Sequence, residues 1–536
     1  MNNAVGASAV MNGEKPSKTR LRGRAFYESL GSPKYILAPM VNQSEFAWRM
    51  LTRSFMSPGK QHELLAYSPM MHARLFAEVT KYRATNFLPT RTAIPSPPEP
   101  YDGKPVQEDD LFLDGNPKFD RPLFVQFCAN DPDILLAAAQ HVQPYCDAVD
   151  LNLGCPQGIA KKGHYGAFLQ EDWDLIARMI RKLNTNLDIP ITAKMRILET
   201  KEKTLEYAKT IIEAGASILT VHGRQRDQKG HNTGLADWSV IKYLREQLPA
   251  DTVMFANGNI LQHGNIDQCL RETGVDGIMS AEGNLSDPTI FSEPPPIGQE
   301  SREYWRGKDG KGGYRMDAVM RRYIDILYKY VLEREPPERL PLFVPSDAPS
   351  SDKVEEINGK VEDASSEGPP RKKAKVDHVR SKAPRDLNPN MVAVQPHLFS
   401  LLRPLVSVHH NVRDALARHR PGDLDSLENV LTLVEAAVKK GLVEYEHDSA
   451  KEPQKLNESD AIGRCRRPYF ICQPYIRPLP AEALAKGSMQ LSKKEKKRRE
   501  EEEAERKRLE KHTTQPEKPE PTRNEAGTVQ QSAVYG

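Results

Sequence analysis

DAVDLNLGCPQGIAKKGHYGAFLQE, residues 147–171, opens with an apolar run typical of a buried strand and continues into a loop rich in glycine and lysine. The run Ala148–Leu153 stops at the Gly-Cys-Pro triplet 154–156, because glycine frees the backbone and proline cannot continue a β-ladder. Cys155 therefore leaves the predicted sheet at a fixed point. In α/β folds the carboxyl ends of the strands face the active site. An isolated cysteine at a strand end is usually an ordinary buried residue, but Asn152 and the cationic loop beside this one favour a site.

The loop that follows Cys155 combines positive charge with backbone freedom. Lys161, Lys162 and His164 lie in a segment hinged by three glycines. Such a loop is expected to move, and its charge suits an anionic ligand. Lys161 and His164 are therefore candidate substrate contacts.

Short apolar runs recur along the first 300 residues, with helical patterns between them. We expect eight strands, at Tyr35–Pro39, Leu64–Tyr67, Leu123–Phe127, Ala148–Leu153, Ile191–Met195, Ser217–Val221, Val253–Ala256 and Asp276–Ser280. Amphipathic segments such as Asp172–Asn184 and Thr204–Ala214 predict helices. Eight β-then-α units over about 250 residues are typical of a (β/α)8 TIM barrel, so the predicted fold class is α/β. A doubly wound sheet usually has fewer strands, and no G-x-G-x-x-G follows the first run.

Composition excludes several classes of protein. The 536 residues allow two or three domains, and a net charge of +3 is too small to indicate a nucleic-acid binder by itself. Six cysteines occur without a C-x-x-C pair or zinc-finger spacing, so we expect a reducing compartment, no disulfide framework and no metal site. No apolar run is long enough to span a bilayer, and the N-terminus lacks the apolar core of a signal peptide. We therefore expect a soluble intracellular protein.

The ends of the seventh and eighth predicted strands suit a phosphate. The triplets Asn257-Gly258-Asn259 and Ala281-Glu282-Gly283 follow these strands. Their glycines expose backbone N–H groups, which is how TIM barrels often bind phosphate. Arg224 or Arg226, after the sixth strand, is a candidate for an additional charge-assisted contact with that anion.

Other strand ends suit a polar ring system that lies across the barrel mouth. Lys194 and Gln126 are candidate hydrogen-bond partners of such a ring, and His222 is a donor near it. A planar phosphorylated cofactor fits these parts, and flavin mononucleotide (FMN) fits best. Lys194 could instead form a Schiff base, although nothing beside it in the sequence requires that. The Cys155 thiol beside a flavin suggests a proton donor or acceptor that accompanies hydride transfer.

Six segments of the chain carry a specific resemblance: LAPMVNQSEFAWRML, VQFCAND, DLNLGCPQGIAKKGHYGAFL, ITAKMRI, TVHGRQRDQKG and ANGNI. Together they resemble the tRNA-dihydrouridine synthases, in the order of that family and over residues 33–290. The loop after Cys155 is most similar to the eukaryotic branch that acts on uridines 16 and 17 of the D-loop. The insertion at Pro89–Arg121 departs from the family pattern.

The resemblance implies an FMN-carrying barrel that NADPH or NADH reduces and that converts uridine to 5,6-dihydrouridine in tRNA. Hydride would reach C6 of a flipped-out uracil, and Cys155 would protonate C5 as general acid. Asn152 and Arg224 would lie near the uracil. The residues that would hold the flavin are Pro39, Met40, Val41, Gln126, Lys194, His222, Asn257, Gly258, Asn259, Ala281 and Glu282.

The segments outside the barrel are assigned by composition and pattern. Two stretches, 301–335 and 389–445, predict a helical domain, and within them the run Met316–Glu335 is strongly helical. The resemblance implies that this domain binds tRNA. The remaining predictions are a disordered leader at 1–30, the barrel at 31–300 with a surface insertion at 89–121, a disordered insertion at 336–388, an irregular segment at 446–491, a charged helix at 492–511 and a disordered tail at 512–536. The cluster PPRKKAKV, residues 369–376, resembles a nuclear import signal, so we expect the protein in nucleus and cytoplasm.

Two alternatives remain open at this point. A small-molecule flavin oxidoreductase of the dihydroorotate dehydrogenase type also has an N-x-x-C-P strand end, with the cysteine acting as a base. A non-catalytic RNA-binding protein with a relict barrel is the other. The lysine-rich loop and the helical domain favour a polyanionic substrate, with tRNA as the only partner and a monomer as the oligomeric state.

Overall fold

The computed structural model describes residues 20–92, 94, 108–347, 388–448, 467–477 and 479. Several predictions fall wholly or mainly on residues outside this description. They are the leader before residue 20, the part of the predicted insertion 336–388 that spans 348–387 with its basic cluster 369–376, the charged helix 492–511 and the tail 512–536. The prediction of disorder is wrong for residues 336–347, where Arg339 pairs with Glu428 and Leu342 is buried.

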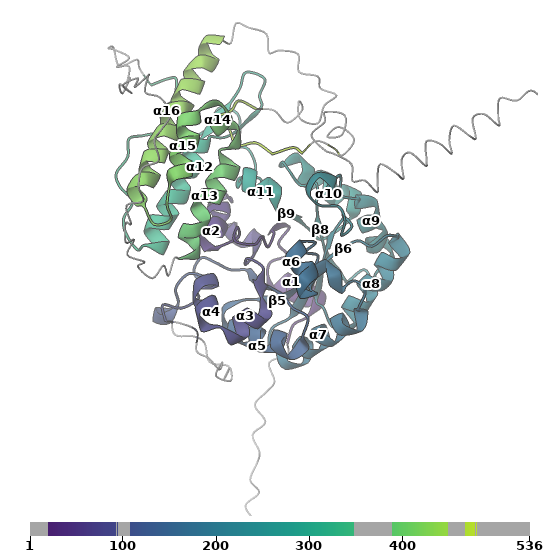
Figure 1. The fold of residues 1–536 in the computed structure, drawn as a ribbon. Coiled ribbons are helices and arrows are strands. Elements are labelled where there is room, and N and C mark those ends of the chain that lie inside the picture. Colours follow the sequence, from purple (N-terminus) through teal and green to yellow (C-terminus); the bar gives the residue numbers. More distant parts are fainter. Residues whose placement is uncertain are drawn as a thin grey trace, which may run out of the picture. The chain divides into compact units, whose positions relative to one another are not determined.

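Eight parallel strands close into a barrel, which confirms the predicted fold class (Figure 1). The strands are β1 (Tyr35–Leu37), β2 (Leu64–Tyr67), β4 (Leu123–Cys128), β5 (Ala148–Leu153), β6 (Ile191–Arg196), β7 (Ile218–His222), β8 (Val253–Asn257) and β9 (Gly277–Ser280). Pairing of β9 with β1, with Leu37 opposite Ser280, closes the sheet. The short strand β3 (Met71–His72) pairs with β4 and was not predicted, because two residues show no period.

Helices surround the strands on the outside of the barrel (Figure 1). They are α2 (Phe46–Ser54), α3 (Ala73–Glu78), α4 (Thr80–Asn86), α5 (Pro132–Val142), α7 (Trp173–Asn186), α8 (Lys201–Glu213), α9 (Trp238–Gln247) and α10 (Gly264–Thr273). Their boundaries follow from capping. Asp172 accepts a hydrogen bond from Leu175 N at the start of α7, and Thr200 accepts one from Lys203 N at the start of α8. The Thr200 cap explains why α8 begins three residues before its predicted start at Thr204.

Shorter helical segments connect these elements. They are α6 (Gly158–Gly163), α11 (Glu282–Ser286), and the single turns η1 (Gln61–Glu63), η2 (Glu108–Asp110), η3 (Gln143–Tyr145), η4 (Gly166–Leu169) and η5 (Gly230–Asn232). Of these, α6, η4 and α11 follow the carboxyl ends of barrel strands and contribute to the site described below.

The prediction of a disordered leader is wrong for residues 20–30. Helix α1 (Gly23–Ser29) buries Phe26 and Tyr27 in the apolar interior of the barrel. The Phe26 ring lies 5.9 Å from that of Phe124, and Tyr27 OH donates to the carbonyl oxygen of Asp276, at the amino end of β9. The three apolar residues among these seven are consecutive, so they show no helical periodicity, and only the tertiary contacts reveal this helix.

The insertion at 89–121 is not confined to the surface, as we had expected. Its described C-terminal part buries Asp114 and Asp120, which pair with the fully buried Arg49 of α2 at 2.7 Å and 2.5 Å. Burial of a charged pair is stable only when each charge has a partner, and these three side chains satisfy one another. The segment therefore fastens α2 to the barrel wall.

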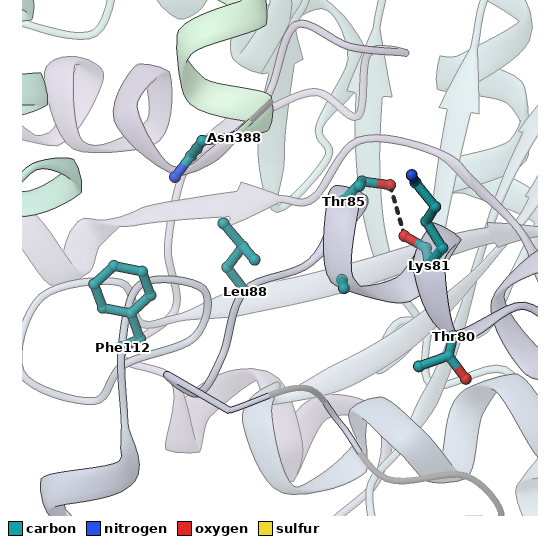
Figure 2. A pocket seen from close by; sticks show the side chains of 7 residues that line it. Thr80, Lys81, Thr85, Leu88, Phe112 and Asn388 are labelled. Atoms are coloured by element: carbon teal, nitrogen blue, oxygen red, sulfur yellow. Dashed lines mark hydrogen bonds between the residues drawn. The ribbon is translucent and has the colours of Figure 1, made fainter. Parts of the chain in front are cut away.

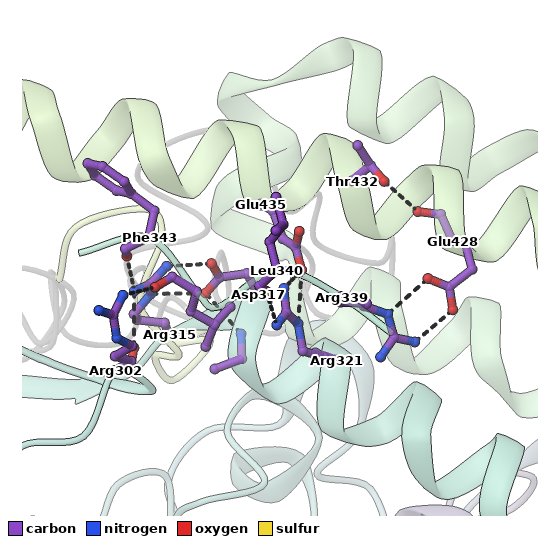
Figure 3. Close-up of polar contacts among 12 residues, drawn as sticks. Arg302, Arg315, Asp317, Arg321, Arg339, Leu340, Phe343, Glu428, Thr432 and Glu435 are labelled. Carbon is purple, nitrogen blue, oxygen red and sulfur yellow. Dashed lines mark hydrogen bonds and ion pairs between the residues drawn. The ribbon is translucent and has the colours of Figure 1, made fainter. Parts of the chain in front are cut away.

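A helical domain follows the barrel and a short hairpin of β10 (Tyr304–Arg306) and β11 (Gly312–Tyr314). It contains α12 (Met316–Ile326), α13 (Pro389–Leu401), α14 (Arg403–Val408), α15 (His410–Arg418) and α16 (Leu424–Asp448). α12 packs against α16 although residues 348–387 intervene in the sequence, as predicted for a split domain. Figure 3 shows ion pairs across this packing, Arg321 with Glu435 and Arg339 with Glu428. The predicted helix Met316–Glu335 instead changes to a π-turn at Leu327–Val331 and ends there.

Helix α2 joins the two parts of the fold. Glu45, immediately before α2, accepts hydrogen bonds from Tyr323 OH of α12 at 3.2 Å and from His397 Nε2 of α13 at 2.9 Å. The His397 ring stacks on Trp48 with a centroid separation of 3.8 Å. These contacts are buried, so the helical domain is packed into the barrel rather than tethered to it. Among the described residues, no helix is both long and apolar enough to cross a membrane.

Candidate active site

The carboxyl ends of the central strands bring the predicted polar residues together on one rim. In the sheet register Asn152 lies opposite Lys194, Arg196 opposite His222, and His222 opposite Asn257. Side chains on one face of neighbouring parallel strands lie side by side, so residues more than 100 positions apart in the sequence share one surface. The sequence predicted this surface because each of these residues ends an apolar run.

A chain of buried hydrogen bonds fixes the backbone at Cys155. Gln126 Nε2 donates to Asp150 Oδ2 at 2.8 Å, and Asn152 Nδ2 donates to Gln126 Oε1 at 2.8 Å. Asn152 Oδ1 then accepts from the backbone N–H groups of Gly154 and Cys155, at 3.2 Å and 2.9 Å. Because a carboxylate can only accept, each amide in the chain has one allowed orientation. Gln126 and Asn152 thus act here as positioning groups for the cysteine.

Asp150 anchors this chain and was missed by the sequence analysis. It is fully buried, and it also accepts from Thr192 Oγ1 at 2.6 Å. Burial raises the pKa of the Asp150 carboxyl to about 6, while the hydrogen bonds from Thr192 and Gln126 and the charge of Lys194 lower it. A signal was available, since Asp150 lies two residues before Asn152 and therefore on the same face of β5.

The loop after Cys155 folds tightly against it. Ala167 N donates to the carbonyl oxygen of Cys155 at 3.1 Å. Gly166 has φ +64°, and a Cβ there would meet the Cys155 carbonyl oxygen at 2.8 Å, so no side chain fits. The predicted substrate contacts Lys161 and His164 lie on α6 and at its end, and both are exposed. Their role in substrate binding stays a prediction.

Residues after β7 hold this loop from the other side. Lys229 Nζ donates to the carbonyl oxygen of Pro156 at 2.6 Å, and Arg226 pairs with Glu171. Both cations also lie over the ring of Phe168, at 5.9 Å and 5.2 Å from its centroid. The sequence left Arg224 and Arg226 as alternative phosphate contacts. In the structure Arg226 supports the loop after Cys155, whereas Arg224 does not.

Arg224 belongs to a cradle formed by the ends of β7 and β8. Its guanidinium donates to Asn259 Oδ1, to the carbonyl oxygen of Gly234 and to His222 Nε2, each at 3.0 Å. His222 Nε2 is consequently an acceptor, so the proton of the neutral ring is on Nδ1. Gly258 has φ +110°, and a Cβ there would lie 3.1 Å from His222 and 3.4 Å from Arg224. This glycine keeps the backbone accessible between the two side chains.

The rim carries an excess of positive charge that fits an anionic cofactor. Arg196 and Arg224 donate to carbonyl, amide and imidazole acceptors, and no carboxylate pairs with either among the described residues. Burial, with the neighbouring Arg196, lowers the pKa of Lys194 to about 8. Burial, with Lys194 and both arginines, holds the pKa of His222 well below its usual value. A phosphate and a polar ring would relieve this mutual repulsion, so the residues present fit a flavin nucleotide.

The remaining predicted cofactor residues lie at the ends of β1, β8 and β9. Pro39, Met40 and Val41 form the turn after β1, where Met40 N donates to Ser44 Oγ at 2.9 Å. Asn257 Nδ2 donates to the carbonyl oxygen of Met279 at 2.9 Å. Ala281 and Glu282 follow β9, and Glu282 pairs with Arg477, a residue that the sequence did not indicate.

A hollow among the described residues lies elsewhere in the fold. It measures about 480 Å³ and lies beside α4, as Figure 2 shows. Its lining residues are Thr80, Lys81, Ala84, Thr85, Leu88, Phe112 and Asn388. None of these follows a barrel strand directly, so the hollow is separate from the rim that carries the chemistry.

We predict that Gly166→Ala lowers turnover while leaving cofactor retention unchanged. The added methyl group must displace the Cys155 carbonyl, and a misplacement of about 1 Å can cost about 10²-fold in rate. Turnover and the absorbance of bound flavin measure the two effects separately. Gly158→Ala is the matched control, because nothing lies within 4 Å of a Cβ there and its φ is not positive. Equal turnover in both variants would contradict the role given to Gly166.

Comparison with known proteins shows the family to which the chain is similar. A model of the family described as dihydrouridine synthase (Dus) matches residues 36–304. The chain is 42% identical over 471 residues to the tRNA-dihydrouridine(16/17) synthase [NAD(P)(+)] of Schizosaccharomyces pombe, covering 87% of this chain and 94% of that one. It is 40% identical over 464 residues to the enzyme of the same name from Saccharomyces cerevisiae, covering 86% and 87%. A mouse protein named as similar to that enzyme is 34% identical over 478 residues, covering 89% and 75%.

Proposed function

The chain belongs to the dihydrouridine synthase family, and from that premise we propose that it reduces uridine to 5,6-dihydrouridine in tRNA, with FMN as its flavin and NADPH or NADH as electron donor. The observation that carries the proposal is Cys155, held by the buried chain from Asp150 on a rim whose two arginines have no carboxylate partner among the described residues. Family membership decides against an enzyme of the dihydroorotate dehydrogenase type.

The rim residues would hold FMN in two parts. Arg224 and the backbone at Gly258 and Asn259 would bind its phosphate, and Lys194 and the Nδ1–H of His222 would donate to its ring. Reduced FMN, when bound, supplies the hydride that C6 of the uracil accepts. Lys194 suits a position beside the flavin ring, because a buried protonated amine stabilises negative charge on that ring.

Cys155 supplies the second hydrogen. Its thiol donates a proton to C5 as the C5=C6 double bond is reduced, and the thiolate regains a proton from solvent. Asn152 fixes the backbone at Cys155, so that the thiol meets a uracil presented from one direction. A uridine in a folded RNA must leave its stack to reach this depth, and the exposed cations Lys161 and Lys162 beside the cysteine suit its phosphates.

The same premise extends to substrate, assembly and location. The names of the yeast relatives support positions 16 and 17 of the D-loop as the target. We propose that the helical domain orients the tRNA and that one chain is active as a monomer.

We also propose that the protein is present in the nucleus as well as in the cytoplasm, on the basis of the basic cluster at 369–376. Imaging of a fluorescent fusion tests this, and unchanged nuclear signal after replacement of Arg371, Lys372 and Lys373 by alanine would count against it.

The proposed activity predicts that Cys155→Ala retains its flavin but loses about 10²- to 10⁴-fold in turnover. Purified protein is reduced anaerobically with NADPH, and reappearance of the flavin absorption is followed after adding unmodified tRNA or orotate. Mapping of dihydrouridine in the product gives the position. Reoxidation by orotate alone would refute the tRNA substrate, and a chain that takes up no FMN would refute the cofactor. Full activity of the alanine variant would exclude Cys155 as the acid.

Lys194 predicts a pH dependence of cofactor binding. Its folded pKa of about 8 lies below its ordinary value, so the free protein loses this proton as pH rises through about 8 while the unfolded chain keeps it. This group therefore adds stability to the cofactor-free protein as pH rises above that value, but it weakens binding of an acceptor ring. We expect FMN affinity to fall above about pH 8, by up to about tenfold per unit.

Titration of FMN fluorescence between about pH 7 and about pH 9.5 measures this effect. Lys194→Met should bind FMN more weakly at neutral pH and should lose the pH dependence. An unchanged slope in the Lys194→Met variant would assign the titration to another group.

A further inference from the structure

Residues 467–477, here called the C-terminal strap, pack against the helical domain without forming a helix or a strand. Cys472 N donates to the carbonyl oxygen of Tyr314 at 2.9 Å, and Met316 N donates to that of Phe470 at 3.0 Å. Phe470 and Cys472 are buried among the residues of β11 and α16. The first half of the strap is thus an integral part of the fold, although the sequence analysis assigned it to an irregular segment.

The far end of the strap reaches the barrel rim. The Tyr475 ring lies under the Arg403 guanidinium, 3.9 Å from its carbon to the ring centroid. Two residues later, Arg477 Nε and one terminal nitrogen donate to Glu282 Oε1 at 2.9 Å and 2.7 Å. Glu282 is the first residue of α11, directly after β9. The strap therefore brings a guanidinium from the helical domain to the cofactor rim.

The Glu282 carboxylate places a negative charge near the proposed phosphate site, and Arg477 compensates that charge. Strand β9 pairs with β8, with Met279 opposite Asn257, so Glu282 follows the strand next to the one that ends at the Gly258 cradle. Burial lowers the pKa of Arg224, the Glu282 carboxylate raises it and the Arg477 guanidinium lowers it, in agreement with that placement. A carboxylate beside a site for a phosphate dianion repels the ligand. In the structure Arg477 neutralises this carboxylate and leaves one donor nitrogen of its guanidinium unused by Glu282.

We propose that Arg477 is a positioning residue of the FMN phosphate site: it cancels the charge of Glu282 and makes cofactor affinity depend on the C-terminal strap. The inference rests on the proposed function for the identity of the cofactor. Its physical content is that a segment outside the barrel completes the charge balance of the barrel rim. The resemblance placed Glu282 among the flavin-holding residues, but in the structure its carboxylate is occupied by Arg477. Removal of the cation should therefore act through the Glu282 carboxylate, and neutralising that carboxylate as well should restore most of the lost affinity.

Cofactor affinity of the flavin-free full chain tests this inference without reference to turnover. FMN fluorescence quenching gives the dissociation constant, and we expect Arg477→Ala to raise it about three- to tenfold, since loss of this partly exposed ion pair leaves the Glu282 charge uncompensated beside the phosphate. Arg477→Glu should raise it further, and Arg477→Lys should retain most of the affinity. The double variant Glu282→Gln with Arg477→Ala should recover affinity close to that of the unmodified chain.

Arg302→Ala is the matched control. Arg302 has the same side-chain exposure as Arg477, 47% against 46%, and also pairs with a carboxylate, that of Asp347. Its variant should leave the FMN dissociation constant and its salt dependence unchanged. FMN binding that all Arg477 variants leave unchanged would overturn this inference alone, as would a loss that the double variant does not restore. Absence of FMN binding by the unmodified chain would overturn the proposed function as well.

Discussion

The pairing of β1 with β9 is the constraint on which the rest of the structure depends. Once this pairing closes the sheet, all eight parallel strands present their carboxyl ends on one rim. Each loop after a strand must then start beside its neighbours, so residues from the whole barrel sequence converge on one surface. The opposite end is free to be filled by apolar side chains, and α1 fills it with Phe26 and Tyr27. Packing and chemistry thus occupy different ends of the same barrel.

Burial of the Asp150 carboxylate inside this barrel costs free energy, and its hydrogen-bond partners and a nearby cation offset that cost. Asp150 has a raised pKa because burial disfavours its charge, yet three groups compensate for it: the Thr192 hydroxyl, the Gln126 amide and the charge of Lys194. The same hydrogen bonds orient Gln126 and then Asn152, which holds the backbone of Cys155. A connected polar network of this kind fixes one arrangement. An apolar residue in place of Asp150 would leave the side-chain amides of Gln126 and Asn152 free to rotate.

The helical domain and the barrel share their most important contacts near the first active-site loop. Glu45 follows the turn that begins at Pro39 and accepts hydrogen bonds from both α12 and α13. The C-terminal strap makes a second connection at Glu282, after β9, the strand that pairs with β1. Two links after neighbouring strands restrict rotation of the helical domain about either link. A domain that presents a large substrate to a fixed reaction site needs this kind of orientation.

The sequence by itself determined the barrel and the residues at its strand ends, because hydrophobic period and breaker residues are local signals. It located Cys155, Lys194 and His222 from those signals, and the family resemblance extended them to a reaction. Four features were decided by the tertiary structure alone. They are the folding of residues 23–29 into α1, the burial of Asp114 and Asp120, the role of Asp150 as anchor of the hydrogen-bond chain, and the placement of Arg224 rather than Arg226 in the cradle. The tertiary structure also decided the arrival of Arg477 at the rim. Each of these depends on contacts between residues distant in the sequence. The sequence alone does not show which residue will pair with a charged side chain once that side chain is buried.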